Sequence, residues 1–253
     1  MFKIFRERTV ITMGFFEGIA ELLTTSEYMG SIFEGLKTTF IISFFAAILG
    51  LILGVCVAMV TIAKKSYGTG FSSRLKNVVL GILKAICKVY ITVVRGTPMA
   101  VQLFIFAYVI FVVRGFPNEI KAIVAFGINS GAYVAENIRA GILSVDIGQT
   151  EAGRSLGLTS SMTMISIVIP QAIKNVIPAI GNELIALIKE TSIVSMIGMF
   201  DLTMAAKIVG SGNNMASYIV PMTVVALFYL AIVYILTFAI KIIEKRLRAS
   251  DKR

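Results

Sequence analysis

The chain has 253 residues, of which 57% are hydrophobic and only 15% are charged, with a net charge of +10 and a mean hydropathy of +0.88. A soluble domain is about half apolar and about a quarter charged, so this composition excludes an ordinary soluble domain. The basic residues lie beside long apolar runs, which argues against nucleic acid as the partner that the positive charge serves.

Residues 1–30 open the chain without the features of a signal peptide. They contain neither a long apolar core nor a cleavage site of small residues. We therefore expect an amphipathic lead-in that lies at the membrane surface.

Five later segments are long and apolar enough to cross a membrane. A helical span needs about 20 consecutive, mainly apolar residues. The sequence therefore predicts an all-α, polytopic membrane protein with about five transmembrane helices in a domain over 31–245. The first, second and fifth spans are almost free of charge, whereas charged residues interrupt the third and fourth. In chain order, the five spans cover about 37–63, 96–113, 120–143, 176–200 and 217–241.

The segment before the second span, 77–95, is an apolar helix with a basic stripe. Lys84, Lys88 and Arg95 project within roughly 40° of one another at a helical spacing. Because long basic side chains can reach from an apolar surface to the headgroups, we expect this helix at the cytoplasmic interface. Pro98 lacks a backbone N–H and disfavours helical geometry at the preceding residue, so it predicts a break before the second span.

Basic residues also predict the orientation of the chain. Loops rich in Lys and Arg remain cytoplasmic, and two such clusters follow the first and the last span. A cytoplasmic C-terminus, with its basic tail over 246–253, combined with five spans implies an external N-terminus. The two clusters comprise Lys64, Lys65, Arg74 and Lys76, and then Lys241, Lys245, Arg246, Arg248, Lys252 and Arg253.

The connection between the third and fourth spans, 144–175, is polar and punctuated by glycine. Asp146, with Gln149 three residues later, forms a capping-box pattern that opens a helix. Glu151 suits the positive end of the helix dipole, and Gly157 suits the left-handed position that ends the helix. An amphipathic segment, 161–173, follows. The sequence thus predicts two short helices that meet at a glycine elbow, although an ordinary connecting loop is the alternative.

The stretch "EAGRSLGLTSSMTMISIVIP" (151–170) resembles the EAA signature of bacterial ABC-importer permeases. That signature is Glu-Ala-Ala, three residues, Gly, nine residues, and then Ile-x-Leu-Pro. Gly153 replaces the second Ala, and Ile169 replaces Leu. The residues that match at the family spacing are Glu151, Ala152, Gly157, Ile167 and Pro170.

The resemblance covers about residues 30–245 and points to the polar amino acid uptake subfamily. "RGTPMAVQLF" (95–104) and "EGLKTTFIISFFAAILGLILG" (34–54) are similar to its second-span and first-span motifs. "PQAIKNVIPAIGNELIALIKETSIVSMIG" (170–198) is similar to its fourth-span block. The fold that the resemblance implies is the transmembrane domain of an ABC type I importer in a bacterial inner membrane.

In this family the EAA loop is the coupling helix that docks on a separate ATP-hydrolysing subunit. The resemblance therefore implies an assembly of two permeases, identical or related, with two ATPases and an external solute-binding protein, embedded in membrane lipid and importing an amino acid. ATP and Mg would be bound by the ATPase, with no cofactor on this chain. The coupling residues that it implies are Glu151, Ala152, Gly153, Ser155, Leu156 and Gly157.

The sequence offers no catalytic site of its own. It lacks the G-x-x-x-x-G-K-[ST] loop that cradles phosphates, it has no histidine, and it shows no metal-binding cluster. We therefore expect a transport subunit and not an enzyme. An ion-coupled carrier or a channel subunit is the alternative function.

Polar residues on the fourth span are the candidates for the substrate pathway. Asn182, Glu183, Lys189 and Glu190 occupy a helical arc of roughly 120°. Ionisable groups within a bilayer usually face a bundle interior or a pathway, although these could instead pair across a subunit interface. Glu136 and Arg139, three residues apart on the third span, fit a structural ion pair. The further pathway candidates are Gln102, Thr191 and Ser192.

Overall fold

The computed structural model describes residues 14–65, 68, 70–112, 115–211 and 218–249, and the described residues form helices without a strand. The chain divides into two compact units. Unit 1 consists of Met1–Ser43 and Ile188–Ile235, and unit 2 consists of Phe44–Leu187 and Leu236–Arg253. Three long helices, α2, α8 and α10, contribute residues to both units. Residues 1–13 of the expected lead-in and 250–253 of the tail lie outside the described residues.

Unit 1 packs short elements against the ends of long helices. Its core consists of fully or almost fully buried aliphatic side chains from the segment 14–24, α2, α9 and α10. Gly35 allows α2 to approach the turn before α9 closely, since a Cβ atom there would lie 2.6 Å from the Asp201 carbonyl oxygen. The elements of unit 1 are residues 14–24, the first part of α2 (Ser26–Ile62), the 3₁₀ helix η3 (Thr191–Ile197), α9 (Leu202–Gly210) and the first part of α10 (Ile219–Arg248).

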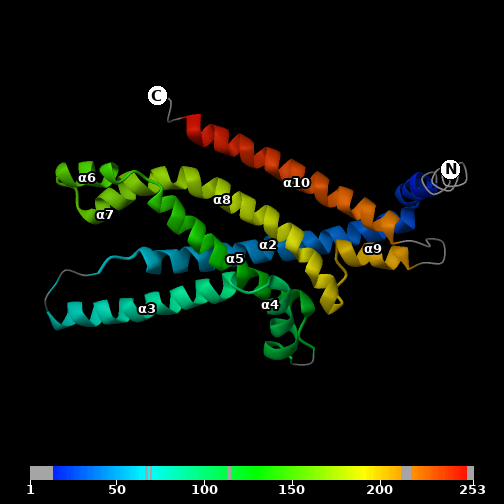
Figure 1. The fold of residues 1–253 in the computed structure, drawn as a ribbon, viewed down its shortest axis with the longest axis horizontal. Helices are drawn as coiled ribbons and strands as arrows, with labels where there is room; N and C mark the ends of the chain where they lie inside the picture. Colours follow the sequence, from blue (N-terminus) through cyan, green and yellow to red (C-terminus); the bar gives the residue numbers. More distant parts are fainter. Residues whose placement is uncertain (1–13, 66–67, 69, 113–114, 212–217, 250–253) are drawn as a thin grey trace, which may run out of the picture. The chain divides into compact units, whose positions relative to one another are not determined.

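Unit 2 contains most of the helical residues. At one of its ends, the helices α6 and α7 form a short hairpin (Figure 1). The hairpin follows the C-terminal end of α5, and the chain continues from it without a break into α8. Besides parts of α2 and α10, the elements of unit 2 are α3 (Phe71–Arg95), α4 (Met99–Ile105), the π-helical turn η1 (Phe106–Ile110), α5 (Asn118–Leu143), α6 (Ile147–Ser155), α7 (Ser160–Thr163), the π-helical turn η2 (Met164–Val168) and α8 (Ile169–Glu190).

Glycines bring α2 and α5 into close contact within unit 2. Gly50 and Gly54 on α2, and Gly127 and Gly131 on α5, are each spaced four residues apart. A Cβ atom on Gly50 would lie 2.9 Å from the Ser130 Cβ atom, and one on Gly127 would lie 2.6 Å from the nearest Leu49 carbon. Small residues at this spacing allow helix backbones to approach closely in membrane proteins. The packing therefore fits a membrane-embedded helix pair.

Four described helical segments are long and apolar enough to cross a membrane: Ser26–Ile62, Phe71–Arg95, Ser160–Ile197 and Ile219–Arg248. The helix α5 has 26 residues, which suffices for a span, but it is not one of these four. Many α5 residues are buried by neighbouring helices, so its polar side chains need not face lipid. The structure thus confirms an all-α chain with four to five helices of spanning character.

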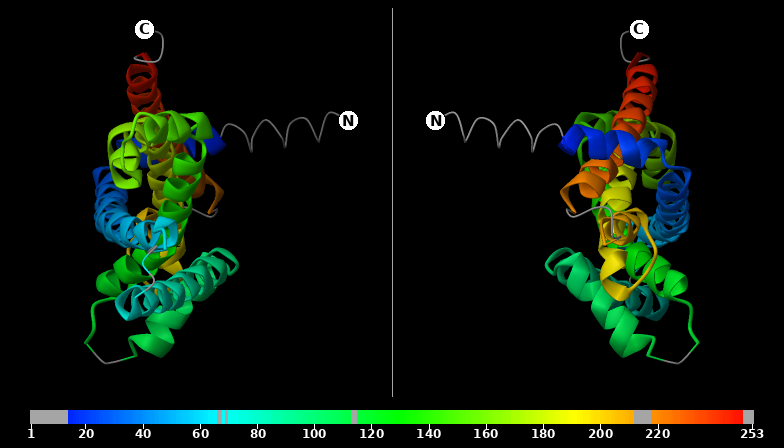
Figure 2. Two further views of the ribbon diagram at one scale, coloured as in Figure 1. Left: turned by 90° about the vertical axis from the view of Figure 1, so that its left-hand side faces the viewer. Right: turned by 90° about the vertical axis from the view of Figure 1, so that its right-hand side faces the viewer.

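The expected second span, 96–113, is not a continuous helix of spanning length. Its apolar helix covers only Met99–Ile110, and α3 before it has the length and composition of a span. The break between them was expected from Pro98 and is present, as Figures 1 and 2 show. The helix then ends early because Phe111 leaves the helical conformation and Gly115 adopts a φ of 82°. The helix within 96–113 is therefore shorter than expected, and the helix with the length and composition of a span in this part of the chain is α3, which includes the segment expected at the interface.

The expected fourth span, 176–200, also changes character before its end. The α-helix α8 ends at Glu190, and a 3₁₀ helix follows to Ile197. Gly198 closes this helix with a φ of 77°. The α-helical spacing that places pathway candidates on one arc therefore holds only as far as Glu190.

Candidate functional site

The helix α6 begins at the predicted cap. The backbone N–H of Gly148 donates to Asp146 Oδ1 at 2.6 Å, which satisfies one of the free donors at the helix start. In a complete capping box the Gln149 side chain would also bond back to the Asp146 backbone N–H, but here it makes a different contact. Gln149 Oε1 accepts a hydrogen bond from Gln171 Nε2 at 3.1 Å, so this side chain joins α6 to α8.

The end of α6 is a Schellman motif built on Gly157. The Gly157 N–H donates to the Arg154 carbonyl at 3.1 Å, and the Leu158 N–H donates to the Gly153 carbonyl at 3.2 Å. Gly157 has a φ of 81°, in the left-handed region that favours glycine. The predicted elbow is therefore confirmed in conformation. Arg154 Nη1 also donates to the Leu158 carbonyl at 2.5 Å, which strengthens the turn.

The second helix of the hairpin packs against the buried side of α6. Thr159 caps it, because its Oγ1 accepts from the Met162 N–H at 3.2 Å. Gly153, which stands where the family signature has Ala, is buried against this helix. A Cβ atom on Gly153 would lie 2.8 Å from Thr163 Cγ2 and 2.9 Å from Ile167 Cδ1. The contact leaves no room for a side chain at this position.

The opposite side of α6 is open. Glu151 and Ser155 each lie about 160° around the helix from the buried Gly153, and both are exposed. Two large apolar side chains flank them, with 75% of Ile147 and 81% of Leu156 exposed. The open side of α6 therefore presents both polar and apolar groups to its surroundings. Ala152 and Gly157 are exposed as well.

Two side-chain bridges hold the hairpin to the long helix that follows it. One is the Gln171–Gln149 hydrogen bond already described. The other joins Asn175 Nδ2 of α8 to Ser144 Oγ, at the end of α5, at 2.9 Å. A displacement of α6 would therefore be passed to α5 and α8 through hydrogen bonds as well as through the chain.

Gln102, a weaker pathway candidate, has its side chain fully engaged by protein. Its Nε2 donates to the Val94 carbonyl at 2.8 Å and to Thr97 Oγ1 at 2.8 Å, with a longer bond of 3.1 Å to the Thr97 carbonyl. Its Oε1 accepts from Asn129 Nδ2 at 3.0 Å. These bonds join the ends of α3 and α4 to α5, an arrangement that favours a structural role.

Glu183 is the pathway candidate that the structure places beside a cavity. It is half-buried in unit 2 and lines a cavity of about 240 Å³ between α2, α5 and α8. Ser130 contributes the second polar side chain, and the other lining residues are apolar or glycine. Asn182, its neighbour on α8, is exposed.

The remaining pathway candidates belong to unit 1. Lys189 is exposed and Glu190 is half-buried, at the last turn of α8. Thr191 is fully buried and donates to the Ile188 carbonyl at 2.6 Å, and Ser192 is half-buried. Their place in a pathway stays a prediction.

The ion pair between Glu136 and Arg139 is present, and the guanidinium binds both carboxylate oxygens. Arg95 adds a third member, with its Nη1 4.0 Å from Glu136 Oε1 and its guanidinium 5.2 Å from the centre of the Tyr133 ring. The pair therefore links α5 to the end of α3, which extends the structural role predicted from its spacing.

Three structurally important residues were missed by sequence reasoning. Asn129 completes the Gln102 cluster, and Thr163 fits against Gly153. Asp201 is fully buried and caps α9, accepting from the Thr203 N–H at 3.0 Å and the Met204 N–H at 2.9 Å. An Asp immediately before a helical run is a readable cap signal, whereas the contacts of Asn129 and Thr163 depend on tertiary structure.

A polytopic helical chain with an exposed, capped hairpin between two long helices has the architecture of a membrane transport subunit. Residues 66–249 match the family described as binding-protein-dependent transport system inner membrane component. The chain belongs to this family, and it is therefore a permease of a binding-protein-dependent importer. This assignment replaces the alternative of an ion-coupled carrier or channel subunit.

Relatives with a substrate in their names agree with that class. The arginine transport system permease protein ArtQ of Bacillus subtilis is 38% identical over 222 residues, which cover 87% of this chain and 94% of ArtQ. A Rickettsia typhi protein named for the permease of a glutamine transport system, GlnP, is 38% identical over 218 residues, covering 85% and 92%. A solved structure described as "Crystal structure of an amino acid ABC transporter with histidines" matches with a TM-score of 0.77 and 36% identity, covering 89% of this chain and 98% of that one.

Proposed function

We propose that this chain is the permease subunit of an ATP-driven importer for polar amino acids. The observation that carries the proposal is the exposed face of α6 around Glu151 and Ser155, on a helix that is bonded to α5 and α8. A separate ATPase docks on this face, with ATP and Mg bound by that subunit. An extracytoplasmic solute-binding protein delivers the amino acid, and a second permease copy or related chain completes the pathway.

The cargo class is supported by the relatives and by the cavity beside Glu183. Two of the similar proteins are named for the transport of glutamine and arginine, and the third is described as an amino acid ABC transporter with histidines. All three amino acids are polar. A carboxylate in a mainly apolar cavity suits the ammonium group that every amino acid carries. If Glu183 binds it, Glu183→Gln lowers the affinity of the purified permease for its amino acid about tenfold, the value of one charged hydrogen bond. Unchanged affinity would remove this residue from the cargo site.

ATP-driven uptake tests the function directly. The permease is reconstituted in proteoliposomes with its ATPase and binding protein, and uptake of labelled arginine, glutamine and histidine is measured. We expect uptake of at least one of them to require ATP and to continue in the presence of an uncoupler. Uptake that an uncoupler abolishes while ATP remains would contradict the proposal.

The proposal includes a topology in the bacterial inner membrane, with a cytoplasmic C-terminus and an external N-terminus. The basic loop after α2 then faces the cytoplasm, and the start of α5 faces outward. After replacement of Cys56 and Cys87, a cysteine at the exposed Ser72 should be protected from an impermeant thiol reagent in intact cells, and one at Asn118 should react. The reverse labelling pattern would invert the topology.

A further inference from the structure

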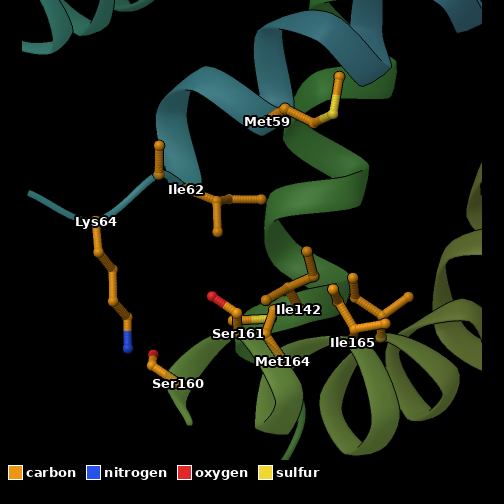
Figure 3. A pocket seen from close by; sticks show the side chains of 10 residues that line it. Met59, Ile62, Lys64, Ile142, Ser160, Ser161, Met164 and Ile165 are labelled. Atoms are coloured by element: carbon orange, nitrogen blue, oxygen red, sulfur yellow. The ribbon is translucent and has the colours of Figure 1, made fainter.

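An open apolar groove lies between the C-terminal end of α2, the C-terminal end of α5 and the continuous helical segment from α7 through η2 to the start of α8, all within unit 2 (Figure 3). Its volume is about 410 Å³. Met59 and Ile165 leave 61% and 64% of their surface exposed, so the walls of the groove are not covered by protein. The apolar side chains that line it are Met59, Ile62, Ala63, Ile142, Met164, Ile165 and Ile169.

The polar groups of the groove gather at one end and carry positive charge. Lys64 extends toward Ser160 there, and Ser161 lies beside them (Figure 3). The ammonium and the two hydroxyls are all hydrogen-bond donors. Among the described residues that line the groove there is no Asp or Glu. The groove therefore combines an apolar channel with a rim suited to an anion.

The position along α2 places this rim at the boundary of the membrane. The apolar helix α2 ends at Ile62, and the chain becomes basic at Lys64 and Lys65. Such a transition coincides with the level of the lipid headgroups. Basic pockets between transmembrane helices on the cytoplasmic side bind anionic lipid headgroups. The inference rests on the proposed function in one respect, the cytoplasmic position of the hairpin.

We propose that the groove binds an anionic phospholipid. One acyl chain lies along the apolar side chains, and the phosphate accepts hydrogen bonds from the Lys64 ammonium and the hydroxyls of Ser160 and Ser161. Burial of the chain removes apolar surface from water, and the ammonium selects the anionic headgroup. Because the groove has walls from α2, α5 and the hairpin, the bound lipid joins the coupling hairpin to the membrane surface.

Native mass spectrometry of the complete transporter in mild detergent tests the site. The probes are phosphatidylglycerol and phosphatidylcholine with the same dioleoyl chains, titrated into delipidated protein. We expect the wild-type permease to bind phosphatidylglycerol about fivefold more tightly, the factor that corresponds to one lysine near an anionic headgroup. Lys64→Gln should reduce this preference to none, whereas Lys65→Gln, which removes the same charge outside the groove lining, should keep it.

A second variant tests the apolar part of the site. Ile165→Asn, at an exposed position that tolerates a polar residue, should weaken the binding of both lipids equally and leave their ratio unchanged. Equal loss of preference in Lys64→Gln and Lys65→Gln would show a general effect of the basic loop and would overturn the proposal. So would unchanged lipid binding in Ile165→Asn.

The outcome is separable from that of the proposed function. Lipid binding is measured without ATP, amino acid or binding protein, so an absence of amino acid uptake would leave the lipid result standing. Conversely, a transporter that imports amino acids but shows no preference for phosphatidylglycerol would keep its function and lose the lipid site.

Discussion

At the scale of single residues, two glycines of the hairpin have opposite constraints. Gly157 needs its left-handed conformation, and a Cβ atom there would meet open space. Gly153 has an ordinary helical conformation, but Thr163 and Ile167 occupy the space of a side chain. The sequence predicted the first, because a glycine after a capped helix is a local signal. It could not predict the second, because the constraint comes from residues ten and fourteen positions further along the chain.

Replacement of Gly157 by Leu should uncouple the transporter. The substitution forces a Cβ atom into the left-handed region, at a cost of about 1–2 kcal/mol, with no steric clash to confuse the result. We expect normal membrane insertion, reduced amino acid uptake and ATP hydrolysis that no longer depends on transport. Gly157→Asn is the matched control, since Asn tolerates this conformation, and it should retain most uptake. Wild-type coupling in Gly157→Leu would remove the elbow from the coupling mechanism.

Gly153→Ala should impair uptake even though Ala favours a helix more than Gly does by about 1 kcal/mol. The added Cβ atom meets Thr163 Cγ2, and Thr163 is held by its own hydrogen bond to the Thr159 carbonyl at 3.0 Å. Overpacking of this kind typically costs about 1–3 kcal/mol and would displace α6. Thr163→Ser removes the methyl group and keeps the hydroxyl, so it should restore uptake in the double variant. A double variant no more active than Gly153→Ala would contradict the packing argument.

At the scale of elements, the helix breaks were more predictable than the helix lengths. Pro98 marked the break between α3 and α4 correctly, because its effect on the backbone is local. The early end of the next helix and the 3₁₀ continuation of α8 had no comparable signal. The spacing of the four glycines between α2 and α5 is visible in the sequence. The sequence does not show that these two helices pack against each other, because that depends on the tertiary structure.

The Gln102 cluster gives a test of element packing. Gln102→Leu removes every hydrogen bond of this side chain and leaves the buried Asn129 amide without the acceptor that it had. A buried polar group left unpaired costs about 1–3 kcal/mol. We expect a lower thermal unfolding temperature of the purified permease, with an unchanged amino acid concentration for half-maximal uptake. A stable variant with weakened cargo affinity would place Gln102 in the pathway after all.

At the scale of the whole molecule, the class was predictable because hydrophobicity and charge distribution act along the entire chain. Long apolar runs require a membrane, and the cap and glycine signals between two of them predict a hairpin of short helices. The division into two units was not predictable, since α2, α8 and α10 each contribute to both. Nor was the groove beside Lys64, whose walls come from three segments that are distant in sequence.

The docking of α6 on the ATPase is the central claim, and site-specific photo-crosslinking tests it most directly. A benzoylphenylalanine at Leu156, which is 81% exposed, is compared with one at Tyr218, which is 53% exposed and lies at the external end of α10 in the proposed topology. In the assembled transporter, the probe at Leu156 should crosslink the ATP-hydrolysing subunit with a yield that changes when ATP is added, and the probe at Tyr218 should not. An intact complex in which the Leu156 probe gives no crosslink to that subunit, or in which both probes crosslink it equally, would contradict the account.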